Sequence, residues 1–155
     1  MKFSSHEDIE APIDFVFAQV SDFPSLERSA LRRGADVQRT DDLTANGPGM
    51  TWSASYKFRG KQRKTQLELL HYDPPNGMSF VTRSNAFTGD ADVDLVALSR
   101  TRTRLMLSFE LKPQSLSARL LVQSLKLARG SLSRKMDARV RAFARDLEER
   151  YHRIS

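Results

Sequence analysis

Apolar and polar residues alternate along the first ten positions of the chain, which is the pattern of a strand with one buried face. Phe3 and Ile9 lie on its apolar side. Pro12 follows at a position that suits the first turn of a helix, and apolar residues then recur at helical spacing. The pattern therefore predicts a strand over 2–10 and a helix over 13–20.

A second, shorter helical pattern follows Pro24 and ends at Gly34, a residue suited to a helix C-terminus. Beyond it, as far as Pro113, short alternating runs are separated by turn-forming residues. The clearest turns are expected at Gly60 and over Asp73-Pro74-Pro75-Asn76-Gly77. Because no helical pattern intervenes, we expect an antiparallel meander rather than βαβ units.

The segment 115–154 contains no proline, and its apolar residues form one continuous stripe at about 100° per residue. It predicts a single long helix, bent near Gly130. A second apolar line runs along the other side of its first half and consists of Leu116, Leu120 and Leu127. We expect the two short helices to cover this line, or the line to border a cavity entrance. Exposure as a lipid or protein contact is the alternative.

The simplest way to bury the apolar faces of these elements is a curved antiparallel sheet that wraps around the long C-terminal helix, with two short helices after the first strand. The chain has 155 residues, of which 39% are hydrophobic, enough for one core but not for two. We therefore expect a single α+β domain over 1–155.

Four local patterns carry a resemblance to a known family. They are Ile9-Glu10-Ala11-Pro12-Ile13-Asp14-Phe15-Val16-Phe17, Val20-Ser21-Asp22-Phe23-Pro24, Pro74-Pro75 and Leu111-Lys112-Pro113. Together with the order of elements, they resemble the START-like, helix-grip superfamily, also called SRPBCC. That superfamily includes polyketide cyclases/dehydrases, coenzyme Q-binding proteins and the major birch pollen allergen family. The resemblance implies a helix-grip fold with a mostly apolar cavity between sheet and long helix for a lipid-like or polyketide-like molecule.

The expected lining of this cavity consists of apolar and aromatic side chains from the concave sheet face and from the helices. They are Phe3, Phe15, Phe23, Trp52, Tyr56, Phe58, Leu67, Leu69, Met78, Phe80, Val93, Leu95, Leu107, Phe109, Leu121 and Leu125. The competing interpretation is that these side chains simply fill a core. The expected function is binding of a hydrophobic small molecule, as a carrier or sensor rather than an enzyme.

Three polar residues, Glu7, Tyr56 and His71, share the strand parity of the expected lining. A carboxylate, a phenol and an imidazole could together supply acid/base chemistry for an aldol-type cyclisation or a dehydration. An enzyme of the cyclase/dehydratase type is therefore the first alternative function. The simpler interpretation pairs Glu7 with Arg28 or Arg83 and leaves His71 solvated beside its turn, so we assign no catalytic residue.

We expect no metal site and no cofactor. The chain has no cysteine, which excludes thiolate ligands, thiol nucleophiles and disulfides. The three histidines lack the spacing of a helical zinc motif. The run Asp90-Ala91-Asp92-Val93-Asp94 lacks the glycine and the final glutamate of a calcium loop.

The net charge of +6 is unevenly distributed along the chain. From Lys112 onward there are 11 Lys and Arg against 4 Asp and Glu, a net charge of +7, whereas the preceding part has 14 against 15, a net charge of −1. A second basic group brackets Gly60 in the predicted hairpin 57–64. It consists of Lys57, Arg59, Lys61, Arg63 and Lys64. A solvated face is the simpler interpretation, and peripheral contact with an anionic membrane is the alternative.

An interaction protein that uses this basic surface on RNA, ribosome or membrane is the second alternative function, with nucleic acid the less favoured partner. The N-terminal segment turns acidic early and lacks the apolar stretch of a signal peptide. No apolar run reaches the length of a membrane-spanning helix. We therefore expect an unexported, cytoplasmic protein, and the sequence specifies neither the ligand nor the oligomeric state.

Overall fold

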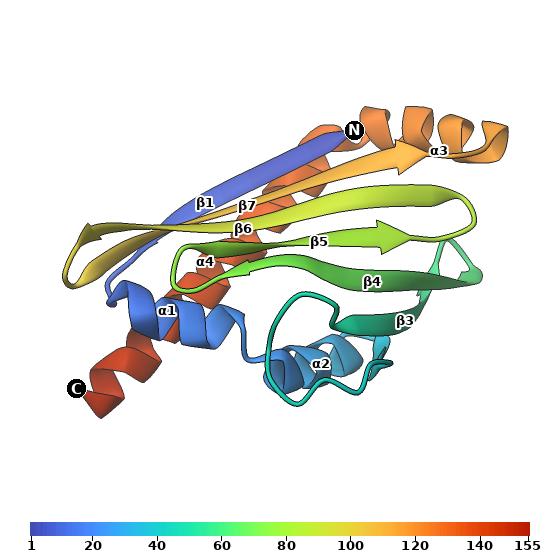
Figure 1. Cartoon of the computed structure of the whole chain (residues 1–155). Helices are drawn as coiled ribbons and strands as arrows, with labels where there is room; N and C mark the ends of the chain where they lie inside the picture. The colour runs from blue at the N-terminus through green and yellow to red at the C-terminus, as the bar shows by residue number, and fades with distance from the viewer.

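The computed structural model describes residues 1–155, and all of its strands belong to one antiparallel sheet (Figure 1). The strands are β1 (Lys2–Ile9), β2 (Asp36–Arg39), β3 (Thr51–Phe58), β4 (Lys61–Asp73), β5 (Gly77–Arg83), β6 (Phe87–Ser99) and β7 (Arg102–Pro113). Their order in the sheet is β1-β7-β6-β5-β4-β3-β2. Strands β2 to β7 thus form the predicted meander, and β1 returns to pair with β7. The short strand β2 was not predicted individually.

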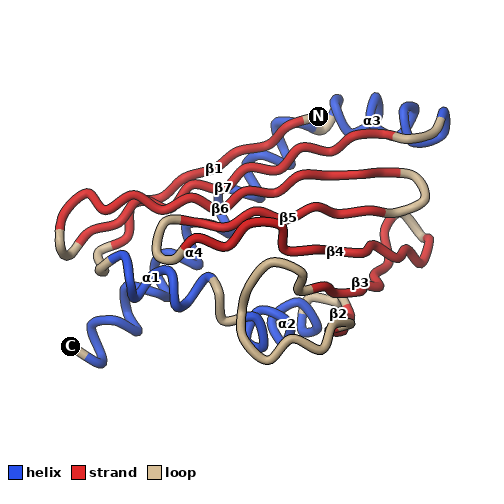
Figure 2. The backbone as a smooth tube through the Cα atoms, in the orientation of Figure 1, coloured by secondary structure: helices blue, strands red, loops and turns tan.

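Four helices accompany the sheet: α1 (Ile13–Val20), α2 (Phe23–Arg32), α3 (Leu116–Leu127) and α4 (Arg129–Ile154). Helix α4 runs diagonally behind the sheet and packs against β1, whereas α3 lies beside β7 (Figures 1 and 2). Helices α1 and α2 connect β1 to β2. This arrangement of a curved sheet around a long C-terminal helix confirms the predicted α+β helix-grip fold. No helix has both the length and the apolar composition needed to cross a membrane.

The C-terminal segment is interrupted close to Gly130, where a bend was expected, and forms two helices instead of a single long one. The break falls at Ala128, whose backbone adopts φ −98° and ψ 10°, and not at Gly130. Just after the break, the Arg129 guanidinium donates a hydrogen bond to the Lys2 carbonyl oxygen at 2.6 Å and lies 5.5 Å from the centre of the Phe3 ring. These contacts hold the start of α4 on β1, so α3 can follow β7 in a different direction.

The hydrophobic core lies where β1, α1 and α4 meet the sheet. Its side chains come from alternating positions of the strands, from one face each of α1, α2 and α4, and from Ala11 and Met50 in connecting segments. They are Ile9, Ala11, Val16, Phe17, Val20, Phe23, Met50, Trp52, Leu69, Met78, Leu95, Leu105, Val140, Ala144 and Leu147. We call the sheet face that carries these strand residues the inner face.

Strand β4 contains a bulge that reverses its two faces. Leu69 pairs with Phe80, whereas His71 pairs with Ser79, so Leu70 is an extra residue between the two pairs. Because successive strand residues point to opposite faces, one extra residue moves every later side chain to the other face. Leu69 is fully buried on the inner face, and His71 is exposed.

An ion pair holds the long connection between β2 and β3. The Arg39 side chain bonds to Asp41 through Nε at 2.5 Å and through Nη2 at 2.8 Å. The Asp41 carboxylate also accepts hydrogen bonds from the backbone N–H groups of Thr51 and Leu43. The Arg39 guanidinium, together with these backbone donors, holds the pKa of the Asp41 carboxyl well below its usual range. Arg39 also lies 5.8 Å from the centre of the Trp52 ring, so the pair ties this loop to the core.

Candidate functional site

The inner face of the sheet is not completely filled. Helix α4 packs on β1 and α3 packs on β7, which leaves a hollow of about 230 Å³ against the middle strands. We call it the inner-face pocket. Its lining residues are Ala54, Tyr56, Thr65, Leu67, Thr82, Ser84, Phe87, Phe109 and Leu111. Except for Ala54, every one of them is half-buried rather than buried, as expected of side chains that border a hollow.

Strand register places these side chains together. Leu67 pairs with Thr82 across β4 and β5, and Thr82 pairs with Gly89 on β6. Gly89 in turn pairs with Leu111 on β7. Residues paired across neighbouring strands point to the same face, so this row spans four strands on one side of the sheet.

Gly89 shapes the floor of the pocket. A β-carbon at this position would lie 2.6 Å from Thr82 Oγ1 and 3.0 Å from the Phe109 ring. The absence of a side chain therefore lets the Phe109 ring lie across β6. A glycine inside a strand that allows a close approach of this kind has a packing reason to be there.

The polar groups of the pocket are hydroxyls, and no lining residue carries a charge. The Tyr56 hydroxyl lies 2.9 Å from Thr65 Oγ1, where either group can donate the hydrogen bond. The Ser84 hydroxyl donates to the Phe87 carbonyl oxygen and accepts from the Phe87 N–H group, both at 3.1 Å. The lining thus presents apolar surface with hydroxyl groups that suit a neutral ligand.

The three candidate acid/base residues do not meet. Tyr56 lines the inner-face pocket. Glu7 lies between β1 and α4, where it faces Arg141 Nε at 3.3 Å and Arg145 Nη2 at 3.7 Å. His71 lies on the outer face, in a shallow polar groove that also contains Asp92. The structure therefore does not bring the three side chains into one cavity, as the cyclase/dehydratase alternative would require, and His71 is exposed, as in the simpler interpretation.

Two physical causes explain this difference. The bulge at Leu70 turns His71 outward, which simple alternation could not show. The expected partners of Glu7 were also wrong, because α4 places Arg141 and Arg145 across from β1, while Arg83 pairs with Glu68 at 3.3 Å. Glu7 thus has an ion-pairing role between strand and helix.

The sixteen residues expected to line a cavity divide between several environments. Those that border the inner-face pocket are Tyr56, Leu67 and Phe109. Those within the packed core are Phe23, Trp52, Leu69, Met78 and Leu95. Those half-buried against the core are Phe15, Phe80, Val93 and Leu107. Those outside both are Phe3 beneath Arg129, Phe58 at a hairpin tip, and Leu121 and Leu125 on α3. Core filling is therefore the correct interpretation for many of them.

Sequence reasoning missed six lining residues. They are Ala54, Thr65, Thr82, Ser84, Phe87 and Leu111. Each of them shares the parity of a predicted inward residue on its own strand or directly beyond its end, so strict alternation could have identified them. They were missed because the expected lining was restricted largely to bulky apolar side chains, whereas several are small or carry a hydroxyl.

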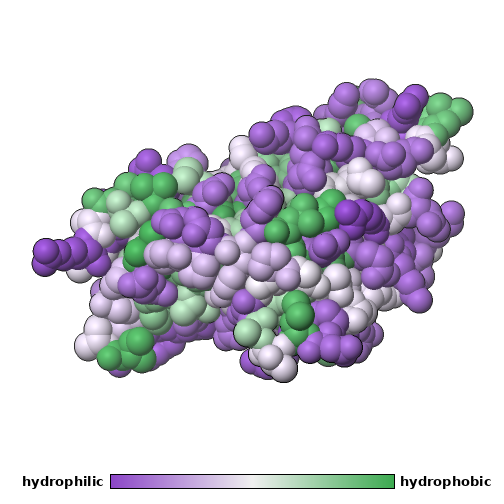
Figure 3. Space-filling view, in the orientation of Figure 1, coloured by the Kyte–Doolittle hydropathy of each residue, from purple (hydrophilic) through white to green (hydrophobic).

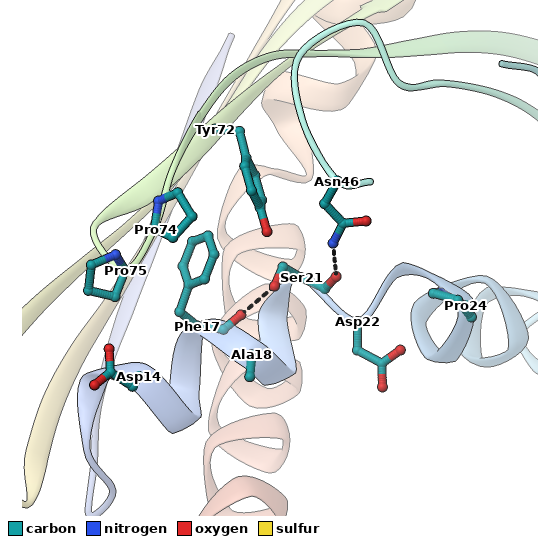
Figure 4. A pocket seen from close by; sticks show the side chains of 10 residues that line it. All are labelled: Asp14, Phe17, Ala18, Ser21, Asp22, Pro24, Asn46, Tyr72, Pro74 and Pro75. Carbon is teal, nitrogen blue, oxygen red and sulfur yellow. Dashed lines mark hydrogen bonds between the residues drawn. The ribbon is translucent and has the colours of Figure 1, made fainter. Parts of the chain in front are cut away.

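A second hollow, an open cleft of about 680 Å³, lies between α1, the start of α2 and the turn from β4 to β5 (Figure 4). The side chains that line it are Asp14, Phe17, Ala18, Ser21, Asp22, Pro24, Asn46, Tyr72, Pro74 and Pro75. Several of its polar groups have partners within the protein. Asn46 Nδ2 donates to the Ser21 carbonyl oxygen at 3.3 Å, and the Ser21 hydroxyl donates to the Phe17 carbonyl oxygen at 2.7 Å. The Asp22 carboxylate accepts from the Ser25 N–H group and caps α2.

The two hollows differ in their titratable groups: the inner-face pocket has only Tyr56, whereas the open cleft has Asp14, Asp22 and Tyr72. No group of three or more His, Asp or Glu side chains is positioned to hold a metal ion. The open cleft is the larger of the two, but its walls are more polar. The inner-face pocket is apolar and lies on the face enclosed by the helices, so it is the better candidate for a hydrophobic ligand.

A curved antiparallel sheet around a long C-terminal helix, with an apolar pocket on its inner face, defines a START-like helix-grip protein. The chain belongs to the family described as polyketide cyclase / dehydrase and lipid transport, whose sequence model matches residues 1–148. The resemblance identified from the sequence is thereby confirmed. Comparison with curated proteins finds no match.

Solved structures agree with this fold. The Zhui aromatase/cyclase from a Streptomyces species has a TM-score of 0.69 at 14% identity, covering 97% of this chain and 94% of its own. A START superfamily protein from Mycobacterium smegmatis has a TM-score of 0.61 at 13% identity, covering 99% of both chains. Ara h 8.0201 has a TM-score of 0.57 at 12% identity, covering 92% of this chain and 98% of its own. At such identities the likeness establishes the fold alone.

Proposed function

We propose that the protein binds a neutral hydrophobic small molecule, lipid-like or polyketide-like, in the inner-face pocket, as a carrier or sensor. The observation that carries this proposal is the pocket lining, which combines apolar side chains with hydroxyls and contains no charged residue. Burying a charged ligand group there would be costly without a partner, so the lining favours a neutral molecule.

The size of the pocket limits what it can hold. Its volume of about 230 Å³ lies below the range of roughly 300–1,000 Å³ that is typical of drug-sized ligands. One or two rings, or the end of a longer chain, would fit within it. The remainder of a longer ligand would extend from the pocket toward solvent.

A cyclase or dehydratase is less well supported than a binding protein. Of the three candidate acid/base residues, only Tyr56 borders the pocket, and its hydroxyl already has a partner in Thr65. General acid/base catalysis needs a group within hydrogen-bond reach of the proton it transfers. Turnover would therefore depend on Tyr56 without a second titratable group in the lining.

Native mass spectrometry of the purified protein, followed by extraction of any retained molecule, tests the proposal directly. A matched pair of variants locates the site. Thr65→Phe fills the pocket from its wall, whereas Thr44→Phe adds the same ring to an exposed loop position. We expect Thr65→Phe to lose the retained molecule and Thr44→Phe to keep it, with both variants folded by circular dichroism. If neither the wild-type protein nor a panel of lipids and aromatic polyketides gives a bound species or a thermal shift, the proposal is wrong.

A further inference from the structure

Helix α3 has two apolar sides, and the fold uses only one of them. Ala118 and Val122 are buried on the inward side of the helix, which packs against β7. On the opposite side, Leu116, Leu120 and Leu127 expose 73%, 64% and 92% of their surface. At about 100° per residue, these three side chains lie within roughly 40° of one another around the helix axis. Figure 3 shows apolar side chains on the surface at the end of the molecule occupied by α3. The two short helices therefore do not cover these leucines, which corrects that part of the expectation, and the leucines are exposed.

All the charged residues in the sequence around these three leucines, which we call the leucine face, are basic. Between Glu110 and Asp137 there is no acidic residue, whereas Arg119, Lys126 and Arg129 all fall within this segment. Helical spacing places Arg119 and Lys126 along one flank of the three leucines. None of these three cations takes part in an ion pair.

The tip of the β3–β4 hairpin completes the surface on the other flank. Arg59 Nη1 donates to Ser124 Oγ at 3.2 Å, and Ser124 lies on the opposite side of the leucine face from Arg119 and Lys126. The hairpin carries further basic side chains outside any ion pair: Lys61 and Arg63 have the parity of the inner face, whereas Lys57 and Lys64 have that of the outer face. Phe58 is 38% exposed at this tip, with the Arg63 guanidinium 5.5 Å from its ring centre.

By contrast, many cations elsewhere on the sheet and on α4 are neutralised locally. Arg104 pairs with Asp8 at 2.8 Å, and Lys112 pairs with Asp90 at 2.7 Å. On α4, Arg141 faces Glu7 and Arg150 faces Asp146. Arg134, Lys135 and Arg139 on α4 are, like the cations of α3 and the hairpin tip, outside these ion pairs. What distinguishes α3 and the hairpin tip is that unpaired cations there border exposed apolar side chains.

We propose that α3 and the β3–β4 hairpin tip form one docking surface for an anionic lipid membrane, with the three leucines inserted at the interface. A helix that is apolar on one side and bordered by Lys and Arg binds this kind of surface by burying its apolar side chains and by electrostatic attraction to the anionic headgroups. A second copy joined through the same face would bring like charges together, and a nucleic acid would leave the leucines without a partner. This surface is separate from the inner-face pocket, so the proposal goes beyond ligand binding and does not depend on it.

Vesicle flotation of the full chain tests the proposal with phosphatidylcholine vesicles, with or without phosphatidylserine. We expect binding only when phosphatidylserine is present, and a decrease as salt is raised. The triple variant Leu116→Ser, Leu120→Ser, Leu127→Ser is expected to lower the bound fraction by about tenfold. A matched control replaces three exposed apolar residues elsewhere, Val96→Ser, Leu98→Ser and Ile154→Ser, and is expected to bind like the wild type.

Several results would overturn the proposal. Equal binding to both kinds of vesicle, or an equal loss in the control variant, would indicate nonspecific adsorption. The leucine variant could bind as well as the wild type while a Lys57→Gln, Arg59→Gln, Lys61→Gln variant loses binding. That result would show a purely electrostatic contact in which α3 takes no part. A dimer in light scattering that the leucine variant dissociates would instead assign this face to a second copy. Ligand binding without vesicles is expected to be the same in all of these variants, so failure here leaves the proposed function untouched.

Discussion

Phe109 lies over Gly89, with its ring 3.0 Å from the place that a β-carbon on Gly89 would occupy. This contact sets the depth of the inner-face pocket, because the ring forms part of the pocket wall. Adding one methyl group at this point would force the ring or Thr82 to move.

The variant Gly89→Ala is therefore expected to lower the free energy of unfolding by about 1–3 kcal/mol, the usual cost of overpacking a close contact. It should also weaken the binding of a fluorescent apolar probe. Gly47→Ala is the matched control, since a β-carbon there meets no atom within 4 Å. Urea titration measures both variants, and equal stability of the two would show that Phe109 can move away at no cost.

The Tyr56 side chain offers a second test of the pocket. Tyr56→Phe removes the hydrogen bond to Thr65 but keeps the ring, so stability should fall by about 1 kcal/mol or less. Tyr56→Ala removes part of the lining and should weaken probe binding further. Calorimetric titration of both variants separates the hydroxyl from the ring. Unchanged affinity in Tyr56→Ala would remove this residue from the site.

Glu7 is expected to contribute to the stability of the fold and not to ligand binding. Its carboxylate faces two arginines of α4 whose side chains are largely exposed, and ion pairs of this kind contribute about 0–1 kcal/mol. Glu7→Gln should therefore cost at most about 1 kcal/mol in a thermal or urea titration and leave probe affinity unchanged. A loss of affinity without a loss of stability would instead make Glu7 part of a ligand site.

The Arg39–Asp41 ion pair predicts a dependence of stability on pH. Arg39 and the neighbouring backbone donors lower the pKa of Asp41 in the folded protein, so its carboxylate stabilises the fold at any pH above about 4, the ordinary carboxyl value. This contribution is lost as the pH falls below that value toward the lowered pKa. Asp41→Asn should thus destabilise the protein at neutral pH, and its difference from the wild type should shrink in acid. Asp42→Asn, at an exposed neighbouring position, is the control, and a difference that persists unchanged to low pH would contradict the assignment.

Most of the fold could be predicted from the sequence because glycine and proline residues mark the turns clearly. Gly60 adopts a positive φ of 74° in the predicted hairpin, and the turn at Pro74-Pro75 falls where it was expected. The bulge at Leu70 could not be predicted, since two consecutive leucines give no sign of which one faces inward. That single residue decided the position of His71, which lies on the outer face, away from Tyr56.

The site was less predictable than the fold for a different reason. Alternation along a strand identifies the inward face but not how far a helix reaches across it. Trp52 and Leu67 are paired neighbours on β3 and β4, yet Trp52 packs in the core and Leu67 borders the pocket. The difference arises from where α3 and α4 lie, which depends on long-range contacts such as that between Arg129 and Lys2.

The break at Ala128 divides the C-terminal segment into two helices that contribute very differently to the hydrophobic core. Helix α4 supplies Val140, Ala144 and Leu147 to the core, so its amides should exchange with solvent only when the whole protein unfolds. Helix α3 buries only Ala118 and Val122, and its removal from β7 would leave that core intact. Substitutions along α3 should therefore cost much less folding stability than substitutions at the core positions of α4.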